Sequence, residues 1–239
     1  MSDPVRVALV AEGVTDYEIL HAAIQEMLAP RSFDLKLLQP EESVAFTGGG
    51  SAGWLGGGWK GVFKWCIQAA ERNDSDLASD PLFIGHDLLV IHVDAEVANE
   101  KAARDLPQLK GRLPCAKSCP PARASCDALR GVVKQVLGGS SMPPSVVLCT
   151  PAASMETWVV AAFFPNDAEM KKKNWECHKK PEGRLAAQAK TERFSKNQIE
   201  YRKRAAAFAA RWSFVTSALP EARRFEEEFG AAMAQPASP

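Results

Sequence analysis

The chain has 239 residues, of which 46% are hydrophobic and 24% are charged, and this is the composition of a globular protein with ample material for a core. It excludes a disordered chain, a collagen-like fibre and a small disulfide scaffold. No apolar run approaches the ~20 residues needed to cross a bilayer. The first residues lack the basic and apolar regions of a secretory signal, so we expect a cytoplasmic protein that does not bind membranes.

The net charge of zero conceals an uneven distribution. Residues 1–100 contain 16 acidic and 6 basic residues, and the remainder contains 13 acidic and 23 basic residues. Within 171–204 there are 12 basic residues against 4 acidic ones. An acidic first part and a basic later part suit a metal-using enzyme that acts on a polyanion. Judged from charge alone, a solvated helical surface is the simpler interpretation.

Strands and helices are predicted to alternate in the first two thirds of the chain. Short apolar runs rich in β-branched residues predict buried strands over 5–11, 33–38, 87–93 and 145–149. The first helix is expected to start with Thr15 and Glu18 as a capping box and to stop at Pro30. Further helices are expected over 62–72, 120–137, 154–164, 182–190, 198–212 and 214–232.

This order predicts an α/β fold, with a mostly parallel, Rossmann-like sheet of about four strands, flanking helices and a helical C-terminal extension. We place an α/β domain at 1–165 and a basic helical extension, packed on it, at 166–239. The first domain has a glycine-rich insertion at 47–61, because 8 of the 16 glycines lie in 48–61.

The glycine-rich insertion is predicted to be a loop rather than a core element, since so many glycines disfavour regular structure. Its spacing is neither that of a Walker loop nor that of a dinucleotide-binding fingerprint. Trp54, Trp59 and Lys60 either close over a ligand or pack locally, and the pattern leaves both open.

Six cysteines in a cytoplasmic chain are expected to stay reduced. Cys115, Cys119 and Cys126 are close in sequence and, with a later Cys or His, could form a zinc site. They lack the paired C-x2-C spacing of zinc knuckles, so packed thiols are the favoured interpretation.

Acidic side chains follow three of the four predicted strands. Glu12 follows the first, with Asp16 one helical turn later, and Asp94 and Glu96 follow the third. Glu156 begins the helix after the fourth, next to Ser154. Because the carboxyl ends of parallel strands share one edge of a sheet, we expect these groups to gather there. If the chain stays extended after the third strand, Asp94 and Glu96 point the same way.

Five carboxylates at one edge would repel one another unless cations neutralise them. Oxygen ligands of this kind suit Mg²⁺ or Mn²⁺, and the set is large enough for two ions. The alternative for each acid taken singly is a helix cap. His92 could support the site through Asp94, but a hydrogen-bonded core histidine is the favoured interpretation, and Tyr201 is expected to be packing.

This arrangement resembles the Toprim domain of topoisomerases, primases and nucleases over roughly residues 5–160. Glu12-Gly13-Val14-Thr15-Asp16 is similar to its glutamate motif and Asp94-Ala95-Glu96 to its D-x-D motif, with Glu96 in place of the second aspartate. The nuclease branch that includes the overcoming-lysogenization-defect family has in addition an S-x-E motif, which Ser154-Met155-Glu156 resembles. Small uncharacterised bacterial Toprim-like proteins look similar through Glu156-Thr157-Trp158 and Cys119-Pro120-Pro121.

The resemblance implies a nuclease that hydrolyses phosphodiester bonds of DNA or RNA with two metal ions. The implied metal ligands are Glu12, Asp16, Asp94, Glu96, Ser154 and Glu156. Glu12 and Asp94 would also be catalytic, together with a lysine of this branch for which Lys196 is the first candidate and Lys190 the second. It also implies a role in bacterial defence, with a protein partner. We expect Lys60, Lys190, Arg193 and Lys203 to bind the nucleic-acid backbone.

Two other functions fit the same sequence. A non-catalytic Toprim-like module would bind nucleic acid or a partner, with Trp158 and the aromatic loop as interface anchors. A small-molecule phosphatase or phosphotransferase could use the same edge, although the basic second half favours a longer polyanion. A topoisomerase is disfavoured, because no tyrosine is obviously placed as a nucleophile.

Overall fold

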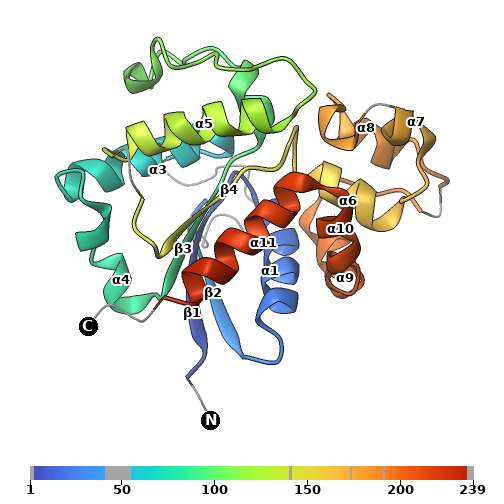
Figure 1. The fold of residues 1–239 in the computed structure, drawn as a ribbon, viewed down its shortest axis with the longest axis horizontal. Helices are drawn as coiled ribbons and strands as arrows, with labels where there is room; N and C mark the ends of the chain where they lie inside the picture. The colour runs from blue at the N-terminus through green and yellow to red at the C-terminus, as the bar shows by residue number, and fades with distance from the viewer. Residues whose placement is uncertain (1–2, 41–54, 140–141, 173, 191, 236–239) are drawn as a thin grey trace.

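Four parallel strands form one sheet in the order β2-β1-β3-β4 (Figure 1). The computed structural model describes residues 3–40, 55–139, 142–172, 174–190 and 192–235. The strands are β1 (Val5–Val10), β2 (Phe33–Gln39), β3 (Leu88–His92) and β4 (Val146–Cys149). Strand β1 pairs with β2 and β3, and β3 pairs with β4. The predicted α/β fold is confirmed.

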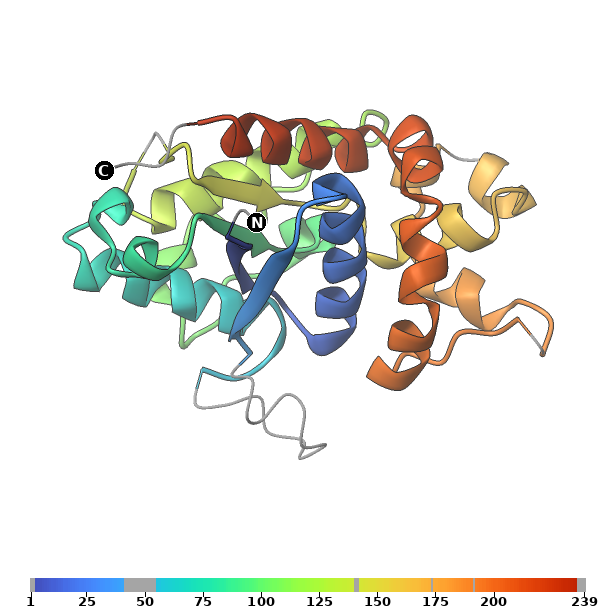
Figure 2. The ribbon, with the colours of Figure 1, turned by 90° about the horizontal axis from the view of Figure 1, so that it is seen from below.

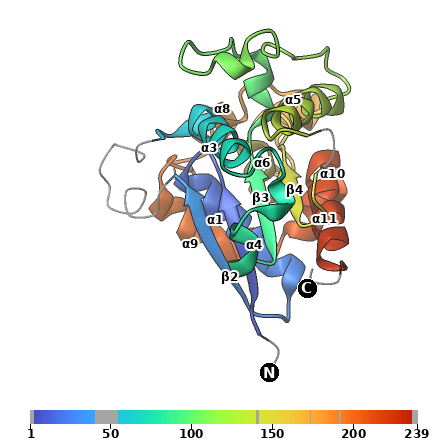
Figure 3. The same cartoon turned by 90° about the vertical axis from the view of Figure 1, so that its left-hand side faces the viewer.

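Helices cover both faces of this sheet (Figures 2 and 3). The strands alternate their side chains, so that Val7 and Leu9 enter one hydrophobic cluster whereas Ala8 and Val10 enter another. The first cluster lies under α1 (Val14–Leu28) and the C-terminal helices, and the second lies under α3 (Gly58–Arg72) and α5 (Arg123–Val136).

Helix α1 starts differently from the prediction. Gly13 occupies the N-cap position without a side-chain hydrogen bond, and Thr15 lies inside the helix, so the predicted capping box is wrong. The Glu18 carboxylate instead accepts hydrogen bonds from Arg202 and Gln198 of α9 (Gln198–Ala209). Glu18 therefore joins α1 to the C-terminal helices.

The end of the glycine-rich insertion belongs to a helix. Residues 47–54, with Trp54, lie outside the described residues, and α3 already begins at Gly58. The Gly58 N–H donates to the carbonyl of Glu12 at 2.9 Å, and this bond places the start of α3 beside the Glu12-Gly13 segment that follows β1. A Cβ at Gly61 would lie 2.3 Å from the Gly56 carbonyl, so this close approach requires glycine.

The C-terminal part is a set of short helices. They are α6 (Glu156–Phe163), α7 (Ala168–Lys172), α8 (Pro181–Ala186), α9, α10 (Trp212–Ala218) and α11 (Pro220–Met233). Earlier in the chain, the short helix α4 (Leu82–Gly85) lies just before β3. The single helix predicted over 214–232 is wrong. Pro220 lacks an N–H and starts a new helix, α11, at that point.

Helices from both predicted parts of the chain share one hydrophobic cluster. Trp158 of α6 is completely buried, with its ring 5.3 Å from that of Trp212 and 5.9 Å from that of Phe225. The suggestion that Trp158 anchors a partner is therefore wrong, since its ring belongs to the core.

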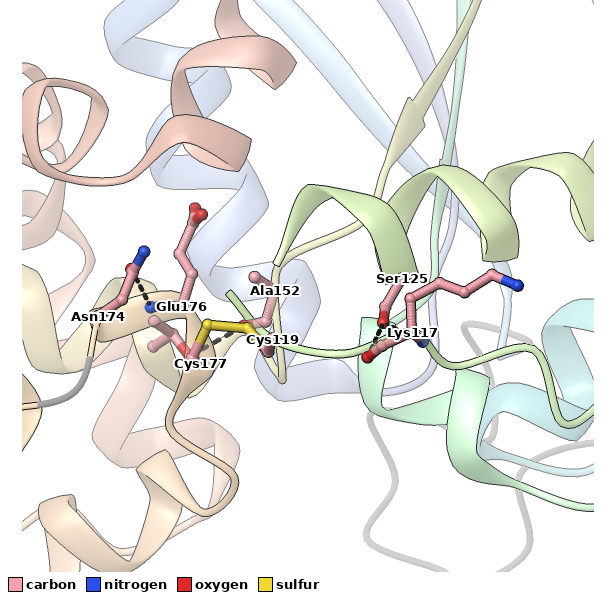
Figure 4. The surroundings of a disulfide bond; sticks show 8 residues. Lys117, Cys119, Ser125, Ala152, Asn174, Glu176 and Cys177 are labelled. Carbon is pink, nitrogen blue, oxygen red and sulfur yellow. Dashed lines mark hydrogen bonds between the residues drawn. A yellow bond between two sulfur atoms is a disulfide. The ribbon is translucent and has the colours of Figure 1, made fainter. Parts of the chain in front are cut away.

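A disulfide joins Cys119, in the loop before α5, to Cys177, with the two Cα atoms 5.6 Å apart (Figure 4). The expectation that all cysteines are reduced is wrong for this pair. Because Cys119 is bonded, the suggested zinc set with Cys115 and Cys126 does not form, and Cys126 is a buried thiol. The bond ties the α/β part to the start of the helical extension.

Among the helices of the described residues, none combines the length and apolar character needed to span a membrane.

Candidate metal centre

The sheet order places two predicted ligands on either side of its topological switch point. Strand β2 lies on one side of β1 and β3 lies on the other, so the direction of the strand order reverses between β1 and β3. The ends of β1 and β3 therefore border the crevice where parallel sheets bind ligands. Glu12 follows β1 and Asp94 follows β3. The Asp94 N–H donates to Glu12 Oε1 at 2.8 Å, which fixes the two motifs against each other.

Asp94 is held from two further directions. Its Oδ1 accepts the Met155 N–H at 2.9 Å and lies 3.2 Å from His92 Nε2. His92 Nδ1 in turn lies 4.0 Å from Asp16 Oδ2. His92 is completely buried, as a core histidine should be, and it lies between the carboxylates of Asp94 and Asp16.

Glu156 is buried and held by two partners. The Ser154 hydroxyl donates to its Oε2 at 2.7 Å, and the Lys196 ammonium lies 2.8 Å from its Oε1. Ser154 therefore orients Glu156, and Lys196, from the segment before α9, supplies the nearest positive charge. The structure thus brings Lys196 to the predicted ligands, whereas Lys190 is an exposed residue of the preceding segment.

Glu96 departs from the expected geometry. The backbone does not stay extended after β3 but turns into a 3-10 helix over Ala95–Asn99, so Asp94 is buried while Glu96 is exposed. The expectation that the two side chains point the same way is wrong. Glu96 still lies near enough for its charge, after burial and that of Glu156, to raise the pKa of Asp94.

Burial and mutual repulsion make the central carboxyl groups hard to ionise. Burial and the charge of Asp94 raise the pKa of Glu12 from 4.5 to about 8. Burial raises the pKa of Asp16 from 3.8 to about 8, although His92 opposes the change. Burial, followed by the charges of Glu156 and Glu96, raises the pKa of Asp94 well above its ordinary value. A bound cation would reverse these shifts.

Glu156 is the exception among these groups. Burial would raise the pKa of Glu156, but the Lys196 ammonium and the Ser154 hydroxyl lower it overall. Burial would lower the pKa of Lys196, but the charge of Glu156 raises it overall. One acid at the site is therefore ionised and paired, while its neighbours lack a counter-charge of comparable strength.

The donor set fits a hard divalent cation in its chemistry. All the predicted ligand atoms are oxygens, which hard divalent cations prefer. Close to the carboxylates, His92 Nδ1 is a buried polar atom without a hydrogen-bond partner, and such atoms call for an explanation. Within the described residues, no three His, Cys, Asp or Glu side chains are arranged to hold a metal ion by themselves. Mg²⁺ sites commonly use only one or two carboxylates, with water and substrate phosphate completing the set.

The predicted nucleic-acid contacts lie at the surface. Lys60, at the start of α3, extends over the Trp59 ring at 5.6 Å, and Trp59 packs edge-on against Phe63. Lys190 and Arg193 are exposed in the segment between α8 and α9 that also carries Lys196. Lys203 is exposed on α9, where it forms an ion pair with Glu200 at 3.4 Å.

One residue at the site was not predicted to belong there. Tyr201 of α9 is 1% exposed, and its buried hydroxyl lies near Glu156. Burial and the negative charges of Glu156 and Asp16 raise the pKa of this phenol. Its position depends on how α9 packs against α1, and no local motif signals that contact.

Comparison with known proteins finds no matching family model, no matching curated protein and no matching solved structure.

Proposed function

We propose that this protein is a Mg²⁺- or Mn²⁺-dependent nuclease that hydrolyses phosphodiester bonds of DNA or RNA by a Toprim-type mechanism. The observation that carries the proposal is the contact between the ends of β1 and β3, where Glu12 and Asp94 meet at the switch point of the sheet. Buried acids with raised pKa values at such a place are typical of functional sites.

The carboxylates of Glu12, Asp16, Asp94 and Glu156 are the proposed ligands, and Glu96 contributes from the exposed side. When bound, the divalent ions supply Lewis-acid polarisation of a phosphoryl oxygen and neutralise the charge that develops there. Ser154 and His92 keep Glu156 and Asp94 in fixed orientations, as supporting residues do in metal sites.

Lys196 is proposed to carry positive charge to the scissile phosphate. Its side chain is 62% exposed although its ammonium contacts the buried Glu156 carboxylate, so it can reach a phosphate oxygen by rotating about its own flexible stem. Its charge would stabilise the phosphoryl oxygens in the transition state. Lys190, Arg193, Lys203 and Lys60 would hold the nucleic-acid backbone without reading its sequence.

A non-catalytic module that binds nucleic acid or a protein partner is the second candidate. Two features of the described residues favour it. Lys196 already neutralises Glu156, and no three His, Cys, Asp or Glu side chains are arranged to coordinate a metal ion. Such a module would bind DNA or RNA in a salt-sensitive way without cutting it.

The test is nicking of supercoiled plasmid and of single-stranded DNA and RNA oligonucleotides with Mg²⁺, with Mn²⁺ or with EDTA. We expect cleavage that requires the metal and that falls about 10²-fold or more in D94N and E12Q. The exposed Glu100 gives the matched control E100Q, which should cleave like the wild type. Salt-sensitive binding with equal background cleavage in all four proteins would refute the nuclease and support the binding module.

A further inference from the structure

Two arginines of the C-terminal part lie over phenylalanine rings. The guanidinium carbon of Arg204, on α9, is 4.4 Å from the centre of the Phe194 ring. That of Arg211, between α9 and α10, is 5.0 Å from the centre of the Phe163 ring. The two rings are themselves 5.0 Å apart. The four side chains therefore form one continuous arrangement, Arg204–Phe194–Phe163–Arg211, which we call the arginine–phenylalanine row.

The row starts close to the proposed metal centre. Phe194 lies two residues before Lys196, whose ammonium contacts the Glu156 carboxylate at 2.8 Å. Glu156 begins α6 and Phe163 ends it, so roughly 10 Å of helix separates this ligand from the far half of the row. Helices α6, α9 and α10 lie on the same side of the molecule (Figure 1). A strand that leaves the metal centre past Lys196 therefore meets the row next.

Both guanidinium groups are held in place at the surface. Arg204 is half-buried, and its guanidinium contacts the Glu200 carboxylate and donates to the Glu200 carbonyl at 3.3 Å. Arg211 is exposed and donates to the Ala207 carbonyl at 3.0 Å. Arg211 is thus held by a ring and a carbonyl rather than by an acid. A guanidinium oriented in advance loses less freedom when it binds a ligand.

A guanidinium that lies over a ring with one face can offer its other face to a second flat group. Unpaired nucleobases stack on aromatic rings and on arginine planes in this way. In a duplex the bases are already stacked on one another, so a duplex offers the same surface little more than its phosphates. The carboxylates of Asp94 and Glu156 are only 7% and 2% exposed, which favours a flexible strand that can bring a phosphate to them.

We propose that the substrate is single-stranded nucleic acid, and that the arginine–phenylalanine row stacks the bases that lie next to the scissile phosphate. This inference rests on the proposed nuclease function and adds the class of substrate to it. Arg211 is the principal stacking residue because it is exposed, and Arg204 continues the surface toward Lys196. The alternative is that the two arginine stems only cover the rings as part of the packing.

Binding without metal tests the proposal independently of cleavage. The measurement is fluorescence anisotropy in EDTA with a labelled single strand of about 12 nucleotides and with the duplex of the same sequence. The wild type should bind the single strand about tenfold more tightly than the duplex. The double variant R204K/R211K keeps both charges but loses both planar groups. It should bind the single strand about fivefold more weakly or worse, with duplex binding and the salt dependence of binding unchanged.

Two further variants separate stacking from charge and from packing. R31K is the matched control, because Arg31 is an exposed arginine beyond the end of α1 opposite to Asp16, and it should bind both substrates like the wild type. F163L removes the half-buried ring under Arg211 and should reproduce the selective loss of single-strand binding. Unchanged single-strand binding by R204K/R211K, or an equal loss for both substrates, would overturn the proposal.

A fluorescent base gives a direct signature of stacking. The fluorescence of 2-aminopurine falls when the base stacks, so an oligonucleotide that carries it should be quenched by the wild type and much less by R211K. No difference between the two proteins at any position of the base would overturn the stacking.

Cleavage assays keep this proposal distinct from the proposed function. Selective binding of single strands through the row, without cleavage in Mg²⁺ or Mn²⁺, would refute the nuclease and leave the row as a binding surface. Metal-dependent cleavage of single strands by R204K/R211K with the KM of the wild type would refute the row and leave the nuclease.

Discussion

Replacing Asp16 by asparagine should stabilise the metal-free protein at neutral and alkaline pH. The Asp16 side chain is buried, and its pKa in the folded chain is about 8 against an ordinary 3.8, with burial as the main cause. A carboxyl group with a raised folded-state pKa takes up a proton on folding, so the free energy of unfolding falls as the pH rises from about 4 to about 8. Asparagine keeps the shape of the side chain and has no charge to bury.

The size of the effect follows from the two pKa values. At pH 7 the difference corresponds to about 4 kcal/mol of lost stability, at about 1.4 kcal/mol per pKa unit, and at pH 4.5 it falls to about 1 kcal/mol. Repulsion from Glu12 and Asp94 contributes to this figure, so part of the gain in D16N is relief of those neighbours.

Urea unfolding in EDTA at pH 4.5 and pH 8 measures the prediction. D16N should exceed the wild type by several kcal/mol at pH 8 and by little at pH 4.5. The exposed Asp34 of β2 gives the control D34N, which should match the wild type at both pH values. A D16N protein that is no more stable than the wild type at pH 8 would refute the argument that Asp16 is a buried charge lacking adequate compensation.

Three further predictions concern the neighbours of this group. K196M should destabilise the protein by about 2 kcal/mol in urea, because Glu156 loses its counter-charge, whereas K190M should change stability by less than about 0.5 kcal/mol; equal losses would contradict the pairing. Mn²⁺ at a hundredfold excess over its Kd at pH 8 should raise the free energy of unfolding of the wild type by about 2.7 kcal/mol. The same Mn²⁺ concentration should stabilise the protein less at pH 5.5, because protons compete with the ion for the carboxylates. An equal gain at both pH values would count against carboxylate ligands. C177S removes the disulfide across 58 residues and should lower the free energy of unfolding by about 4 kcal/mol. A reducing agent should lower the stability of the wild type by a similar amount and leave C177S unchanged. If the reducing agent destabilises C177S as much as the wild type, the disulfide is not the cause.

The sheet could be predicted because its signals are local. The runs at Val5–Val10 and Leu88–His92 are apolar and β-branched, and buried parallel strands require such residues. Glu12 and Asp94 could be expected at one edge because parallel strands end there together. Pro220 marks the break between α10 and α11, but the helical pattern continues on both sides of it and therefore predicts a single helix.

The remaining features depend on packing between distant parts of the chain. Tyr201 reaches Glu156 only because α9 lies against α1, and Glu18 binds Arg202 instead of capping its own helix for the same reason. Glu96 turns away because β3 ends at His92 and a 3-10 helix begins at Ala95, with Asp94 as its N-cap residue, and the sequence D-A-E does not specify this turn. Local patterns predict the elements, whereas these contacts follow from how the elements pack.

The most direct measurement is anomalous X-ray diffraction from crystals of the wild-type protein equilibrated with millimolar Mn²⁺. The proposed metal site predicts an anomalous peak just beyond the end of β3, within about 2.3 Å of an Asp94 carboxylate oxygen and close to Glu12. A well-ordered site that keeps Lys196 on Glu156 and shows no peak near Asp94 at saturating Mn²⁺ would contradict it.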